Sequence, residues 1–253
     1  MLVLRYSLRY LVLAIAVLFL LICGNWPGIS VKEPEMPSPQ VHPLPPTLAA
    51  WQNNRSNNDY FEQIQPSPLG YLLWTEFPVK VYWPQPLESE LENASELRFQ
   101  QWSLAIAQAV EEWEQYLPLS RVFQAHSADI IIERMAPPLG SRFDPETGKL
   151  EIPRARTAQT KYEFYLKGNS SEIIAHRMSV YLSPGLSQAA TLGAARHELG
   201  HALGIWGHSP VETDALFFSQ VGYAPSISRR DINTLKKIYQ QPTRLGWSLP
   251  NGP

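Results

Sequence analysis

The chain has 253 residues, a formal net charge of −2 and a hydrophobic content of 44%. This length fits one domain of ordinary size with appendages, and the hydrophobic content is sufficient for a packed core. The near-neutral charge argues against a nucleic acid as partner. Cys23 is the only cysteine, so we expect neither a disulfide nor a cysteine ligand for a metal in the mature chain.

The first 26 residues have the pattern of a targeting segment. Two arginines precede a purely apolar run that ends at Cys23, which is typical of a secretory signal peptide and short for a membrane span. Because a clean cleavage site of small residues is missing, an uncleaved membrane anchor through residues 10–26 is the alternative. A lipid anchor on Cys23 is a third interpretation, which the large Ile22 disfavours. All three place the remainder of the chain outside the cytoplasm, as a secreted, periplasmic or membrane-anchored protein.

Residues 27–66 have the composition of a disordered linker. The first part is rich in proline and the second in asparagine, and neither shows the periodicity of a helix or a strand. We therefore expect an extended spacer, followed by a single globular domain over residues 67–253.

The globular part begins with a strand, a long helix and a second strand. Residues 77–83 alternate apolar and polar side chains and are followed by a proline, which predicts a strand. An amphipathic helix is predicted over about 94–117, with a buried stripe that starts at Leu97 and includes Trp102. Residues 128–133 form a short apolar run that is typical of a buried strand.

The second half of the chain predicts a pair of strands and two helices. The runs 161–166 and 173–182 are separated by turn-forming residues and predict a hairpin or adjacent edge strands. A helix is predicted over about 187–203, which Gly204 can end in a left-handed cap. The last helix is expected to begin at Ser228, where the sequence resembles a capping box.

The segment that begins at His197 contains the candidate metal-binding and catalytic residues. His197 and His201 are four residues apart on the predicted helix, so their imidazoles lie one turn apart on one face and can bind a single zinc ion. Glu198 stands next to the first histidine, where a general base for a metal-bound water is needed. A catalytic zinc takes a third protein ligand and keeps one position open. His208 is the preferred candidate for this ligand, and Asp214 is the alternative.

The run H-E-L-G-H-A-L-G-I-W-G-H resembles the metzincin signature H-E-x-x-H-x-x-G-x-x-H, and the chain is most similar to the matrixin, or matrix metalloprotease, branch of that family. The similarity extends over most of residues 67–253. The segments 74–83, 102–119 and 226–239 are similar to the first strand, the first helix and the closing helix of this branch. The resemblance implies an α+β fold of the zincin type, with a twisted mostly parallel sheet, an antiparallel edge strand, an active-site helix and two further helices.

Two departures from the family pattern affect the site. The family places its third histidine where this chain has Gly207, and His208 comes one residue later. We expect Gly207 to absorb the extra residue as a bulge with a positive φ. The family also has a methionine under the zinc, in a run similar to Ala-Leu-Met. This chain has Phe217 at that position, so we expect the phenylalanine to form the packing floor beneath the metal.

The resemblance also implies an activity. We expect a zinc-dependent metalloendopeptidase, a hydrolase with one catalytic Zn²⁺ held by the three histidines and with Glu198 as the base. The edge strand, within 173–182, would hold an extended protein or peptide substrate by strand addition. Phe217 and Tyr223 would line the pocket for the side chain that follows the cut. The protein is expected to act as a monomer.

Two other functions stay open at this point. A catalytically impaired relative with the same fold would act as an extracytoplasmic binding module, which the displaced histidine and the missing methionine motivate. A membrane-tethered interaction protein would instead bind its partner through the proline-rich spacer.

Overall fold

The computed structural model describes residues 36–52, 58–86, 93–140, 142–143, 145–151, 156–168, 172–219 and 223–250. All of these residues belong to one unit, Met36–Pro253. The targeting segment expected over residues 1–26 lies outside the described residues. Within the described part of the chain, no helix has the length and apolar character needed to cross a bilayer.

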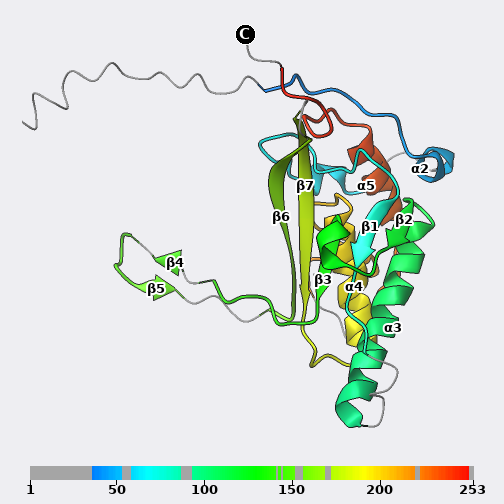
Figure 1. Cartoon of the computed structure of the whole chain (residues 1–253), viewed down its shortest axis with the longest axis vertical. Helices are drawn as coiled ribbons and strands as arrows, with labels where there is room; N and C mark the ends of the chain where they lie inside the picture. Colours follow the sequence, from blue (N-terminus) through cyan, green and yellow to red (C-terminus); the bar gives the residue numbers. More distant parts are fainter. Residues whose placement is uncertain are drawn as a thin grey trace, which may run out of the picture. The chain divides into compact units, whose positions relative to one another are not determined.

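A five-stranded sheet forms the scaffold, with its strands in the order β2–β1–β3–β7–β6. The strands are β1 (Val79–Tyr82), β2 (Leu119–Arg121), β3 (Ile130–Glu133), β6 (Ala158–Lys167) and β7 (Ile173–Leu182). β1 pairs in parallel with both β2 and β3, and β3 pairs in parallel with β7. Only β6 is antiparallel to its neighbour, β7, and it lies at the edge. The predicted mostly parallel sheet with one antiparallel edge strand is thus confirmed (Figure 1). A small two-stranded sheet, β4 (Arg142–Phe143) and β5 (Leu150–Glu151), stands apart from it.

The edge strand that would hold a substrate was expected within 173–182, and this expectation is wrong. The strand with the free edge is β6. β7 pairs with β3 on one side and with β6 along its full length on the other. Its side chains alternate between half-buried and buried from end to end, as in a strand that is covered on one face. β6 is more polar and less buried than β7. This suits an edge strand, because a polar edge does not promote pairing with strands of other molecules.

The three predicted long helices are present as α3 (Ala94–Glu114), α4 (Gln188–Ala202) and α5 (Arg229–Tyr239). Their N-terminal ends follow from local capping: Asn93 and Ser228 form capping boxes, and the Ser187 hydroxyl accepts a hydrogen bond from the backbone of Ala190. α3 packs against α4, and Trp113 on α3 donates its indole N–H to a carbonyl oxygen of α4.

The buried stripe of α3 starts later than expected. Leu97 is 48% exposed, whereas Trp102 is buried. Leu97 lies in the first turn of α3, and the first turns of this helix extend past the sheet (Figure 1). Periodicity alone identifies the face of a helix, but it does not show where the opposing surface ends.

The expectation of a disordered linker over 27–66 is wrong for its described residues. The short helix α2 (Pro46–Ala50) inserts the fully buried Leu48 into the core, and Tyr60 and Ile64 are also buried. Gln40 forms two backbone hydrogen bonds with Thr243. Scattered apolar side chains anchor this segment, and an average over its proline-rich composition does not reveal them. Residues 36–52 and 58–66 therefore belong to the same packed unit as the rest.

Candidate metal centre

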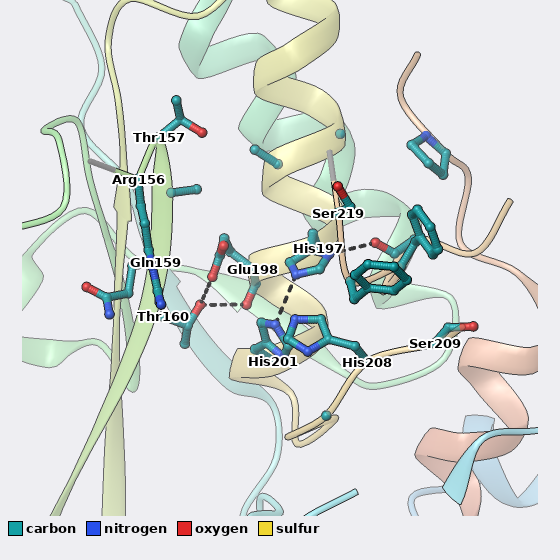
Figure 2. A pocket seen from close by; sticks show the side chains of 18 of the residues that line it. Arg156, Thr157, Gln159, Thr160, His197, Glu198, His201, His208, Ser209 and Ser219 are labelled. Atoms are coloured by element: carbon teal, nitrogen blue, oxygen red, sulfur yellow. Dashed lines mark hydrogen bonds between the residues drawn. The ribbon is translucent and has the colours of Figure 1, made fainter. Parts of the chain in front are cut away.

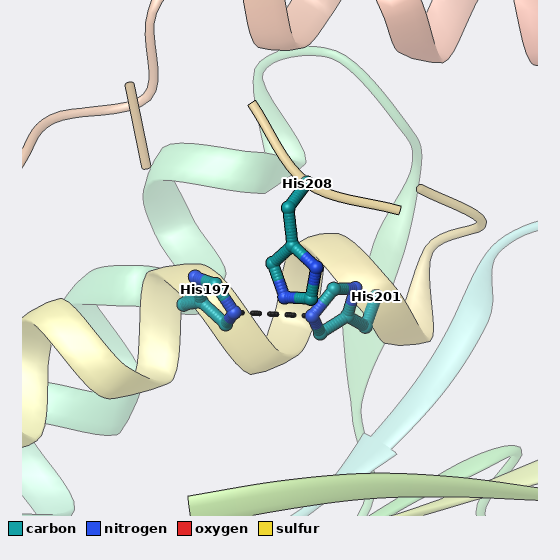
Figure 3. Close-up of side chains that lie close together, drawn as sticks. All are labelled: His197, His201 and His208. Atoms are coloured by element: carbon teal, nitrogen blue, oxygen red, sulfur yellow. Dashed lines mark hydrogen bonds between the residues drawn. The ribbon is translucent and has the colours of Figure 1, made fainter. Parts of the chain in front are cut away.

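α4 carries two of the three histidines at the site. His197 and His201 lie one turn apart on it, and their Nε2 atoms are 3.0 Å from each other. His208, from the loop after α4, brings its ring to 5.2 and 4.9 Å from those of His197 and His201, measured between centroids. One nitrogen from each ring lies within 4.8 Å of the other two. Figure 3 shows the three rings converging on one point.

Backbone carbonyl groups orient the two helical histidines. Nδ1 of His197 is 2.9 Å from the Ala215 oxygen, and Nδ1 of His201 is 2.7 Å from the Ile205 oxygen. Since a carbonyl oxygen only accepts, both Nδ1 atoms carry the hydrogen, and each Nε2 is left with a lone pair. A carbonyl partner of this kind is typical of a histidine that binds a metal.

The charge state of these rings makes the site suitable for a cation. Burial lowers the pKa of His197 and of His201 to about 4 each, so both are neutral at pH 7. Burial also lowers the pKa of His208. Two lone pairs that face each other across 3.0 Å repel unless a cation binds both. Two nitrogens in the tetrahedral shell of a zinc ion lie roughly 3.3 Å apart, so the residues fit such an ion.

The loop that presents His208 depends on two glycines. Gly204 follows α4 with φ +124°, so the predicted positive-φ turn at this position is present. Gly207, by contrast, does not have a positive φ, and the predicted bulge with that conformation is wrong. Position 207 needs a glycine because another part of the backbone lies very close to it. A Cβ there would overlap the carbonyl oxygen of Gln63. Gln63 ends the short 3₁₀ helix η1 (Phe61–Gln63), and Gln65 donates a backbone hydrogen bond to Trp206 at 3.0 Å.

Asp214 does not contact the imidazoles but holds the loop that presents His208. Its Oδ2 accepts from the Ser209 hydroxyl at 2.5 Å and from Nε of Arg230 at 2.9 Å. A neighbouring carboxylate, Asp231, is fully buried and accepts from the backbone N–H of Ala215 at 3.0 Å. The residue that supplies the carbonyl group to His197 is therefore itself fixed through α5.

Glu198 lies in the same cavity as the histidines and is oriented by the edge strand. The Thr160 hydroxyl of β6 is 2.6 Å from Glu198 Oε2 and 3.0 Å from the backbone oxygen of the same residue (Figure 2). Burial raises the pKa of Glu198, and the hydrogen bond from Thr160 opposes this rise. Nothing in the sequence pattern singled out Thr160, because its role depends on which strand lies beside α4.

The cavity has a volume of about 1100 Å³ and is bounded by β6, α4 and the loop after His208. Phe217 and Tyr223, the two expected pocket residues, both line it. The Tyr223 hydroxyl donates to the backbone oxygen of Glu212 at 3.3 Å. In the turn between the two histidines, a Cβ on Gly200 would meet the fully buried Leu216. Phe217, the residue expected beneath the metal, is half-buried, lines the cavity and packs on Phe218.

Comparison with models of known protein families finds none that matches this chain, and no curated protein matches its sequence. The assignment of the site therefore rests on its own residues. They form a mixed α/β unit in which His197, His201 and His208 can bind a metal ion.

Proposed function

We propose that this protein is a zinc-dependent metalloendopeptidase of the metzincin type. The observation that carries the proposal is the convergence of three imidazoles, two of them with their Nε2 lone pairs facing each other, beside a buried carboxylate in one open cavity. Imidazole ligands suit zinc, copper, iron and nickel. Three imidazole ligands with a glutamate beside them match the residues that hold a catalytic zinc in particular.

In this proposal His197, His201 and His208 hold the ion. Bound zinc would lower the pKa of a water molecule and polarise the carbonyl group of the scissile bond. Glu198 accepts the proton of the attacking water and passes it to the leaving nitrogen. The raised pKa of this carboxyl favours the second transfer, and the Thr160 hydroxyl holds it toward the cavity.

The substrate is a protein or peptide held in an extended form. The first residues of β6 line the cavity, and no strand among the described residues pairs with the side of β6 that faces away from β7. A peptide can therefore pair with β6 and place a side chain between Phe217 and Tyr223. We also propose that the enzyme is a monomer that acts outside the cytoplasm, either secreted or tethered through residues 10–26.

The test is the variant Glu198→Gln in the protein loaded with zinc. We expect hydrolysis of casein or a peptide library to fall at least 100-fold, while the zinc content stays at about one per chain, because this residue is a base and not a ligand. Activity that survives the substitution, or that resists a chelator, contradicts the proposal.

The third ligand is tested by a matched pair of variants. His208→Ala should lower zinc occupancy sharply, whereas Asp214→Asn should retain it, because Asp214 contacts Ser209 and Arg230 rather than the imidazoles. The opposite result would transfer the ligand role to Asp214. A wild-type protein that binds zinc but cleaves no peptide would support the alternative, an extracytoplasmic binding module.

A further inference from the structure

Arg156 gives the cavity a positive charge on the side of the edge strand. It immediately precedes Thr157 at the start of the β6 region, and it is the one lysine or arginine among the described residues that line the cavity. Figure 2 shows its side chain extending along β6 toward Thr160 and Glu198. The guanidinium is therefore presented toward the place where the proposed reaction occurs.

The Arg156 guanidinium forms no ion pair with the described residues. Its charge nevertheless acts on Glu198, which lines the same cavity. Burial raises the pKa of the Glu198 carboxyl, and the positive charge of Arg156 is one of the effects that oppose this rise. Two other arginines near the site are already paired: Arg196 with Glu112 and Arg230 with Asp214. Arg156 is exposed, so its hydrogen-bond donors are accessible from the cavity.

We infer that Arg156 binds a carboxylate of the peptide that occupies this cavity. This inference rests on the proposed function, and it adds the class of substrate: peptides that carry an acidic group close to the scissile bond. A guanidinium offers a planar fork that matches a carboxylate with two hydrogen bonds. The only carboxylate that lines the cavity among the described residues is Glu198, which already accepts the Thr160 hydroxyl.

The acidic group has two possible sources that share this chemistry. It is either the side chain of an aspartate or glutamate, or the free carboxylate at the end of a short peptide. The first source gives an endopeptidase selective for acidic sequences. The second gives a peptidase that cuts internal bonds close to the C-terminal end of its substrate.

The experiment measures binding to the full-length, zinc-loaded Glu198→Gln protein, so that cleavage does not remove the ligand. Labelled decapeptides carry glutamate or glutamine at each position in turn, and each is made with a free or an amidated C-terminus. Fluorescence anisotropy gives the ratio of dissociation constants for each pair. We expect the acidic member of one pair to bind roughly tenfold more tightly, as a charge-assisted hydrogen bond implies.

In the Glu198→Gln protein, the further substitution Arg156→Gln should make acidic and neutral peptides bind equally well, without weakening the binding of the neutral ones. Arg156→Lys should restore part of the preference for the acidic peptides. Lys80→Gln is the matched control, because it removes the same charge from an exposed residue of β1 that does not line the cavity. The positions that respond, or the response to C-terminal amidation, identify the source of the carboxylate.

The inference is overturned if acidic and neutral peptides bind equally, if neither binds, or if Arg156→Gln retains the preference. Hydrolysis by the wild-type protein, measured in parallel on the same peptides, separates this result from a failure of the proposed function. Cleavage without acidic preference removes only the role of Arg156. Acidic preference in binding without any cleavage removes only the peptidase.

Discussion

Among single residues, Thr160 has the contact with the clearest consequence for the proposed chemistry. Its hydroxyl joins β6 to the carboxylate of Glu198 and is buried with it. The interaction orients the carboxylate at the cavity and opposes the effect of burial on its pKa. Thr160 is thus a positioning residue that acts through Glu198.

We predict that Thr160→Val lowers kcat by about tenfold, because valine has the same shape but does not donate a hydrogen bond to the carboxylate. Thr160→Ser should restore most of the activity. The zinc content of both variants should equal that of the wild-type protein, since Thr160 does not contact the histidines. Equal losses in the valine and serine variants would indicate a packing role for the methyl group instead.

At the level of elements, the loop that carries His208 packs on residues 61–65, which precede the sheet in the sequence. Gly207 lies against the carbonyl oxygen of Gln63 in η1, and Gln65 is hydrogen-bonded to Trp206. The contact leaves no room for a side chain at Gly207. The position of the third imidazole is therefore determined jointly by α4 and by η1.

We predict that Gly207→Ala weakens zinc binding and lowers the free energy of unfolding by about 1–3 kcal/mol, because the added methyl group separates the loop from η1. Gly185→Ala is the control, since a Cβ there meets nothing within 4 Å. Zinc titration and thermal melting of the two variants measure both effects. A Gly207→Ala protein that binds zinc like the wild type would show that the loop tolerates the shift.

At the scale of the whole molecule, the residues before the sheet complete the core. Leu48 is fully buried, and the Trp51 indole donates to the side chain of Asn233 in α5 at 2.9 Å. The Tyr60 hydroxyl donates to Asp231 at 2.5 Å. Asp231 in turn fixes the backbone of Ala215, whose carbonyl group orients His197. This N-terminal segment is thus connected to the candidate metal centre through α5.

We predict that Leu48→Ala lowers the free energy of unfolding by about 2–5 kcal/mol, as expected for a cavity in a packed core. Val41→Ala, in the same proline-rich segment but 55% exposed, should change it by less than about 0.5 kcal/mol. Denaturant unfolding of both variants gives the comparison. If the segment were a disordered linker, the two substitutions would have the same negligible effect.

The sequence by itself was sufficient for the features that arise from neighbours along the chain. Capping at Ser187 and Ser228 and the i, i+4 spacing of His197 and His201 are local properties, so the helices and two of the three imidazoles could be placed from them. The β6–β7 pair followed from alternation and a short connection.

Only the tertiary structure decided what depends on contacts between distant segments. The free edge belongs to β6 because β3 pairs with β7. Thr160 meets Glu198 because that edge lies beside α4. Gly207 is needed because η1 packs against it, not because of its own dihedral angles. Periodicity reports which face of an element is apolar, but it does not report which element covers that face.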